Sequence, residues 1–567
     1  MDFAALVQDT IREYFAHSPV QATTVGIHDH DDRWPDLSAQ GRRDHAAFLR
    51  GTLERFQRLD PATLSREEGI DRQVLTYYLE GDLFAIEDLS DLTWNPMSYV
   101  YVGGDGLFAL LAREFAPREV RLASAAARMR GLPALLDQAR ENLTERRHGP
   151  EGSGTRREVS RTHTEKALKT MPGVADLART AAAEAEELGD EELRRSVQAA
   201  ARLAVEAVDA YTDWLEQELL PRATGDFRLG PELYDQKFRH FLKSEVTPDQ
   251  LEARAQASYD EMRAEMLRLA RALWPEWIGS EPMPDDENQL VRRVLDTIAA
   301  HHPGADELLD YCRAENGRIE AFVRERDLVG LADEPMQIIW TPPFLRAFGG
   351  AMLIPPGPFD RGLDSFFAIT PMPPDWTDAQ RESYLRENNS RQLRLLTIHE
   401  AVPGHYLQLA WSNRSPAVVR TAFQSGVFAE GWAVYVTQVM MDVGYGADDP
   451  ALMLVHWKFY LRAVINTLID IGIQARGMGE DEAMRLMVEG GFQEHSEAAN
   501  KWDRARLSST QLCEYYLGAV EMTDLEHEAR RRAADSGDEF VYRPFLESVL
   551  SHGTPPMPIL REMLAAS

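Results

Sequence analysis

LRLLTIHEAVPGHYLQ (residues 393–408) places His399, Glu400 and His405 close together, behind an apolar run that is typical of the end of a buried helix. Further along, FAEGWAVY adds Glu430 from a second apolar helical stretch. Two imidazoles and a carboxylate form a ligand set that suits Zn²⁺, and a second carboxylate beside the first imidazole could act as a general base. The pattern predicts a metal site held by two buried helices.

The spacing of the two histidines requires a distorted helix. In the motif HExxH the histidines are four residues apart, about 40° around a helix, so both reach one ion. Here they are six residues apart, which a regular helix would turn by about 240°. Pro403 lacks the N–H that a helix needs, and Gly404 tolerates unusual backbone angles. We therefore expect a bulge, or a break and restart, between His399 and His405.

HEAVPGHYLQ followed by EGWAVY resembles a bacterial family known as domain of unknown function 885, whose pattern is HEAxPGHxxQ and then EGWAxY. The resemblance covers most of the chain, from SPVQATTVGIHDHDDRWPDLS near the start to QLCEYYLG near the end. It implies a zincin-like metallopeptidase of the gluzincin type. It also implies that His399, His405 and Glu430 bind one zinc ion and that Glu400 is the general base.

A late family segment, PGQALSYxxG, falls on residues 509–518 of this chain. Gln511, Tyr515 and Gly518 match it, but Ser509 and Thr510 replace its Pro-Gly. Peptide hydrolysis needs a hydrogen-bond donor where negative charge develops on the carbonyl oxygen. We expect Tyr515 to be that donor.

Other interpretations of the motif stay open. Pro-Gly could simply end a buried helix, with His399 and His405 as core histidines, or the site could bind metal without turnover. The substrate could also be an amide or ester other than a peptide. Glu430 favours a metal, because it shares a helix face with Ala433 and Val434, where a carboxylate is costly unless it is paired. The pair His527-Glu528 has no following His in register and predicts a solvated helix face.

Composition narrows the class of partner and compartment. The chain has 567 residues and a formal charge of −31, which repels nucleic acid and anionic membrane surfaces. We expect a peptide or another small amide as substrate.

Cys312 and Cys513 are the two cysteines, which excludes a disulfide framework. The N-terminal MDFAALVQDTIREYF has no basic region, long apolar core or lipobox cysteine, so we expect a cytoplasmic protein. The oligomeric state does not follow from the sequence.

The periodicity predicts a mainly α-helical, zincin-like body with a small β-sheet next to the active-site helix. We expect one large catalytic body over residues 1–567. Its N-terminal helical half is 1–225, and its C-terminal half, 226–567, carries the sheet (336–370) and the metal site (393–442). Short β-type runs lie at Met336–Thr341, Ala351–Ile354 and Ser365–Thr370. We expect either Ser365–Thr370 or Gly349–Ile354 to line the cleft beside the metal, although a purely structural hairpin would fit as well.

The remaining expectations concern single segments. Asp378–Glu400 is predicted to be one long helix capped by Thr377, and Phe428–Asp442 to be the second metal helix. Gly103, Gly104 and Gly106 predict a turn. HGPEGSGT (148–155) predicts an exposed loop, or a lid over a cleft. His28, Asp29, His30, Asp31 and Asp32 have metal-ligand residue types but more often form a hydrogen-bonded surface turn. Arginines that could hold a substrate carboxylate, such as Arg346, are too many to rank.

Overall fold

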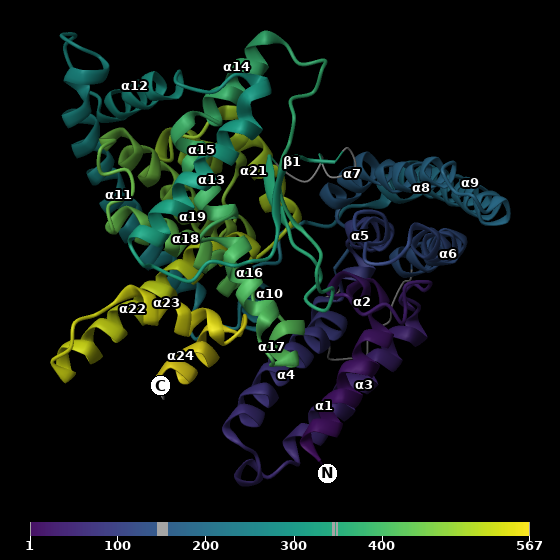
Figure 1. Cartoon of the computed structure of the whole chain (residues 1–567). Coiled ribbons are helices and arrows are strands. Elements are labelled where there is room, and N and C mark those ends of the chain that lie inside the picture. Colours follow the sequence, from purple (N-terminus) through teal and green to yellow (C-terminus); the bar gives the residue numbers. More distant parts are fainter. Residues whose placement is uncertain (1, 145–156, 343–345, 347–349, 566–567) are drawn as a thin grey trace. The chain divides into compact units, whose positions relative to one another are not determined.

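The chain is mainly α-helical with one small sheet, as the sequence predicts (Figure 1). The structure is a computed structural model that describes residues 2–144, 157–342, 346 and 350–565. The predicted loop 148–155 lies outside these residues. None of the described helices combines the length and the apolar character needed to cross a membrane.

The chain divides into two compact units. The first consists of Met1–Phe227 and Pro356–Leu363, and the second of Arg228–Pro355 and Asp364–Ser567. The sequence analysis placed its two halves at 1–225 and 226–567, without the short excursion at 356–363. That excursion lies in the connection between the second and third strands of the sheet and groups with the first unit. Every residue of the predicted metal site belongs to the second unit.

The first unit is built from helices, drawn in purple to blue in Figure 1. The predicted turn at Gly103, Gly104 and Gly106 is wrong, because all three lie inside helix α5. The reason is packing: a β-carbon on Gly106 would lie 2.1 Å from the Trp34 ring. The helices are α1 (Phe3–His17), α2 (Pro19–Val25), α3 (Ala39–Gln57), α4 (Arg66–Phe84), α5 (Met97–Leu111), α6 (Arg118–Thr144), α7 (Arg161–Thr170), α8 (Pro172–Ala185) and α9 (Glu191–Trp214).

The second unit carries the remaining helices, from teal to yellow in Figure 1. They are α10 (Pro231–Leu242), α11 (Pro248–Trp277), α12 (Glu287–Ala299), α13 (Leu308–Glu325), α14 (Asp378–Glu387), α15 (Ser390–Glu400), α16 (His405–Arg414), α17 (Val418–Ala422), α18 (Gly426–Asp442), α19 (Pro450–Ala475), α20 (Glu480–Arg485), α21 (His495–Leu507), α22 (Glu514–Ser536), α23 (Tyr542–Ser551) and α24 (Met557–Ala565).

The predicted single helix from Asp378 to Glu400 is wrong, because the chain breaks it into α14 and α15. Asn388 leaves helical geometry, and the Asn389 side chain then accepts hydrogen bonds from the next two free backbone N–H groups. Asparagine favours such caps because its short side chain satisfies donors that a helix start leaves unpaired. Thr377 caps α14 as predicted.

The three strands form one sheet in the order β1-β3-β2. β1 (Met336–Trp340) pairs in parallel with β3 (Ser365–Ile369), and β2 (Ala351–Ile354) pairs antiparallel with β3. Apolar side chains of β1 and β3 pack against Leu393 of α15, which places the sheet next to the predicted metal helix. Since β3 is central and buried, β2 is the edge strand on the side away from β1.

Candidate metal centre

The predicted break and restart between the two histidines is present. α15 ends at Glu400, and α16 begins at His405. Gly404 is required at this corner, because a β-carbon there would lie 2.0 Å from the carbonyl oxygen of His399. The indole Nε1 of Trp432 donates a 2.8 Å hydrogen bond to the carbonyl of Pro403 and so ties the corner to α18. The break thus returns His405 to the side of the chain that faces His399.

His399, His405 and Glu430 come together, with one ligand atom of each within 4.8 Å of the others. Nε2 of His405 lies 3.3 Å from Glu430 Oε2, and Nε2 of His399 lies 3.8 Å from the same oxygen. Two ligands about 2.1 Å from a tetrahedral zinc ion lie roughly 3.4 Å apart, so these separations fit one ion. Glu430 Oε2 is buried and accepts no hydrogen bond of good geometry from any of the described residues. The donor set and the orphaned oxygen therefore both fit a metal ion.

The protonation states favoured at His399 and Glu430 suit metal binding, and the carboxylates around His405 attract positive charge to the site. Burial, helped by the nearby His405, lowers the pKa of His399 to about 3, which keeps this imidazole neutral. Burial also opposes charge on His405, but the carboxylates of Glu430 and Glu400 outweigh it and raise its pKa. Burial raises the pKa of Glu430, yet the two histidines and Arg504 outweigh it, so the net shift is downward. Glu430 is thus held as a carboxylate next to imidazoles.

Glu400 lies beside the three ligand residues and is held by the sheet. Its Oε2 accepts a 2.9 Å hydrogen bond from the backbone N–H of Leu353, in the edge strand β2. The residue is 8% exposed, and burial raises its pKa above the ordinary value for glutamate. A raised pKa brings a carboxylate closer to the range in which it can both accept and return a proton near neutral pH. Of the two strands named from the sequence, β2 is the one in contact with the site.

Tyr515 is brought to Glu430 by a close helix crossing. α18 and α22 meet at Gly431 and Gly518, where a β-carbon on Gly431 would lie 2.3 Å from the Cα of Gly518. Gly431 directly follows Glu430, and Gly518 lies one turn after Tyr515. Burial, followed by the charge of Glu430, raises the pKa of Tyr515, so its phenol stays protonated. Its oxygen accepts a 3.3 Å hydrogen bond from Arg504 Nη2, which leaves its own O–H free to donate.

The loop before Tyr515 accommodates the residues that replace the family's Pro-Gly. Thr510 has φ +69°, in the left-handed region that favours glycine. The buried carboxylate of Asp470 holds it there by accepting hydrogen bonds of 2.8 Å from Thr510 N and 3.2 Å from Leu512 N. Tyr234 adds a third hydrogen bond to Asp470, of 2.8 Å. Thr510 therefore keeps the turn that a glycine would make more easily.

Several neighbours of the site escaped the sequence analysis. Arg504 hydrogen bonds Tyr515, and the Phe459 ring lies 5.6 Å from the His399 ring. Glu514 is partly buried near Glu430, and desolvation followed by the charge of Glu430 raises its pKa to about 8. The available signal was the basic run at 501–506, KWDRAR. Arg346, the example named from the sequence, donates to the carbonyl of Thr341 in its own loop.

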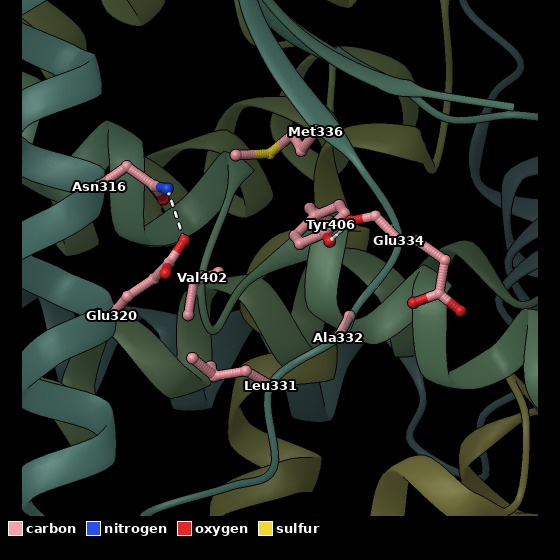
Figure 2. A pocket seen from close by; sticks show the side chains of 8 residues that line it. All are labelled: Asn316, Glu320, Leu331, Ala332, Glu334, Met336, Val402 and Tyr406. Carbon is pink, nitrogen blue, oxygen red and sulfur yellow. Dashed lines mark hydrogen bonds between the residues drawn. The ribbon is translucent and has the colours of Figure 1, made fainter.

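A pocket of about 130 Å³ is lined in part by Val402 of the corner (Figure 2). Its acidic groups already have partners: Glu320 accepts from Asn316 and Arg324, and the Glu334 side chain accepts from Arg414. The three candidate metal ligands do not line it. The lining residues are Asn316, Glu320, Leu331, Ala332, Glu334, Met336, Val402 and Tyr406. This pocket is separate from the metal centre.

The acidic turn at residues 28–32 forms hydrogen bonds in the first unit. His28 Nδ1 lies 2.9 Å from Asp31 Oδ2, and His28 Nε2 lies 2.9 Å from Asp360 Oδ1. His30 Nδ1 faces Arg33 Nη2 at 2.6 Å. Both nitrogens of His28 are therefore occupied by carboxylates, which matches the surface-turn interpretation of this stretch.

The sequence pattern of a family described as "Bacterial protein of unknown function (DUF885)" matches residues 19–564. A solved structure from Shewanella oneidensis, described as a candidate lipoprotein of unknown function, is 30% identical, with a TM-score of 0.85 and 100% of both chains covered. Another, from Colwellia psychrerythraea and also described as a candidate lipoprotein, is 17% identical, with a TM-score of 0.81 over 100% of this chain and 98% of that one. No curated protein matches the chain.

Proposed function

The chain belongs to the bacterial DUF885 family. From the geometry of its candidate metal centre we propose that it is a zinc-dependent hydrolase, and most specifically a metallopeptidase that cleaves short peptides. The observation that carries the proposal is the convergence of His399, His405 and Glu430 beside a separate buried carboxylate, Glu400. A purely structural zinc site has no need for a second acidic group held next to its ligands. In this chain a hydrogen bond from β2 keeps that group in place.

His399, His405 and Glu430 would hold one zinc ion. When bound, zinc lowers the pKa of water and polarises a carbonyl group. Glu400 accepts the proton of the attacking water and later returns it to the nitrogen of the leaving amine, a role that its raised pKa supports. Tyr515 donates its O–H to the carbonyl oxygen of the cleaved bond as negative charge develops there.

The edge strand β2 offers a way to bind the peptide. An edge strand has backbone N–H and C=O groups on its outer side, and an extended peptide can pair with them. Leu353 N, which donates to Glu400, belongs to that outer row, so a peptide beside β2 lies next to the general base. Recognition through the backbone tolerates different side chains, which is consistent with a peptidase of broad specificity.

The test is digestion of a mixed peptide library, read by mass spectrometry, with zinc-loaded wild type beside Glu400→Gln. We expect wild type to cleave and the variant to bind zinc without cleaving. Equal cleavage by both would overturn the role of Glu400. Absence of cleavage by both proteins, with zinc bound to both, would overturn the peptidase proposal and favour another amide or ester, or a metal-binding protein without turnover. His527→Ala, on a solvated helix face, is the matched control and should cleave like wild type.

A further inference from the structure

Four basic side chains gather near the candidate metal centre, in a chain whose formal charge is −31. Two come from α19, which faces the centre through Phe459, and two come from α21, which packs on α19. They are Lys458, Arg462, Lys501 and Arg504. Such a group of cations attracts an anion, and the structure shows how much of that attraction is already satisfied.

The two cations on α19 are neutralised by one carboxylate. Glu387, the last residue of α14, pairs with Lys458 at 3.3 Å and with Arg462. Burial opposes the charge of Glu387, but the two cations outweigh it and lower its pKa to about 2. This carboxylate pairs directly with α19 and reaches Lys501 of α21 only as a more distant charge.

The two cations on α21 are not matched in this way. Lys501 is 8% exposed, and the carboxylate with which it pairs, Glu497 on its own helix, is 4.0 Å away. Arg504 donates to two neutral groups, Gln511 Oε1 at 2.6 Å and Tyr515 Oη at 3.3 Å, and forms no ion pair within the described part of the chain. Burial lowers the pKa of Lys501 to about 8, so it is still charged at neutral pH. Lys501 is thus a buried charge whose partner is distant, which is costly, whereas Arg504 is exposed and can meet an incoming anion.

Arg504 connects these cations to the catalytic groups through Tyr515. Its planar guanidinium has five donors, which match the two oxygens of a carboxylate. We propose that Arg504, with Lys501 behind it on α21, binds a carboxylate of the substrate. That carboxylate is either the free C-terminus of a short peptide or an acidic side chain beside the cleaved bond. The inference rests on the proposed peptidase function and adds the class of substrate to it.

The experiment uses three versions of a short peptide: one with a free C-terminal acid, one with a C-terminal amide, and an amide with Asp or Glu next to the cleaved bond. Zinc-loaded wild type is expected to cleave a carboxylate-bearing peptide with a kcat/KM at least tenfold above that of the plain amide. Arg504→Gln should reduce this preference to within twofold, mainly by raising KM. Arg504→Lys should restore part of it. Preference for the free acid identifies an exopeptidase, and preference for Asp or Glu identifies a side-chain site.

The matched control is Arg506→Gln, on the same helix, where the native arginine pairs with Asp503. It should keep the wild-type preference. Tyr515→Phe should lower kcat for all three peptides alike, which separates carboxylate binding from the neighbouring tyrosine. Equal cleavage of all three by wild type, or a preference that survives Arg504→Gln, would overturn the proposal.

Measurements of peptide binding test the carboxylate site independently of the proposed peptidase activity. Calorimetry with the same three peptides and the Glu400→Gln protein measures affinity without turnover. If wild type cleaves nothing but this protein binds a carboxylate-bearing peptide at least tenfold more tightly than the plain amide, and Arg504→Gln removes the difference, carboxylate recognition holds while the peptidase function fails. If it binds all three equally, or none, the carboxylate site is overturned.

Discussion

Gly431 of α18 and Gly518 of α22 lie backbone against backbone where their helices cross, so that a β-carbon on Gly518 would lie 2.0 Å from the carbonyl oxygen of Val427. This crossing sets the distance between a metal-ligand candidate and the candidate oxyanion donor. Glu430 precedes one glycine, and Tyr515 lies one turn before the other. The small size of two residues that touch no substrate therefore determines the geometry of the site.

Replacing either glycine should separate the helices. For Gly431→Ala we expect a loss of about 3 kcal/mol or more in the free energy of unfolding, because the clash is with backbone that cannot rotate away. Zinc affinity should fall as well, since Glu430 moves with α18. Urea denaturation and metal titration measure both quantities. Gly317→Ala is the control: it is exposed in α13 with nothing within 4 Å of the added carbon, and it should be neutral or slightly stabilising. Equal behaviour of the two variants would contradict the tight crossing.

One zinc ion should be bound per chain, and removing one ligand should largely abolish binding. We expect His405→Ala and Glu430→Ala each to weaken zinc binding by roughly a hundredfold or more, because only two of the three protein ligands would remain. Inductively coupled plasma mass spectrometry after dialysis, with competition by a chelator, measures the stoichiometry and the affinity. His527→Ala should bind zinc like wild type. Undiminished binding by either ligand variant would refute the assignment.

The buried carboxylate of Asp470 should be needed for the loop that leads to Tyr515. Asp470→Asn exchanges one accepting oxygen for an NH₂ group, so one of the backbone N–H groups of Thr510 and Leu512 is left facing a donor. An unsatisfied buried donor costs about 1–3 kcal/mol, and we expect a loss of unfolding free energy of that size. Zinc binding should be retained while kcat falls, because Tyr515 is displaced. Tyr234→Phe, which removes a single hydrogen bond to the same carboxylate, should cost only about 1 kcal/mol and leave kcat near wild type.

The ion pairs of His28 should make the first unit less stable at alkaline pH. Burial lowers the pKa of His28, but hydrogen bonds and charges from Asp31 and Asp360 outweigh it and raise the pKa to about 9. Because the folded pKa lies above the unfolded value of about 6.5, the stabilisation is complete below pH 6.5 and is lost as the pH rises through 9.

With screening at this partly exposed site, the contribution of His28 is on the order of 1–2 kcal/mol. Urea unfolding of His28→Gln and wild type should therefore differ by this amount at pH 6 and by much less at pH 9.5. A difference between His28→Gln and wild type that is independent of pH would contradict the charged state of His28.

The sequence by itself determined the parts of this protein whose chemistry is local. Pro403 lacks the N–H that a helix needs and Gly404 permits unusual backbone angles, so a distortion between His399 and His405 was predicted from residue types alone. The strand runs at 336–340, 351–354 and 365–369 were predicted to within a residue, because β-branched and aromatic runs between turns favour strands over short distances. The mainly helical fold class follows from the same kind of periodicity.

Only the tertiary structure decided which distant groups meet. The choice of β2 as the strand that touches Glu400 depends on sheet order, since β3 lies in the centre. The approach of Tyr515 to Glu430 depends on the crossing of α18 and α22 at two glycines, and the contact of Arg504 with Tyr515 depends on where α21 packs. Periodicity identifies the buried face of a helix but not the helix that will cover it, because that choice is a property of the whole packed core.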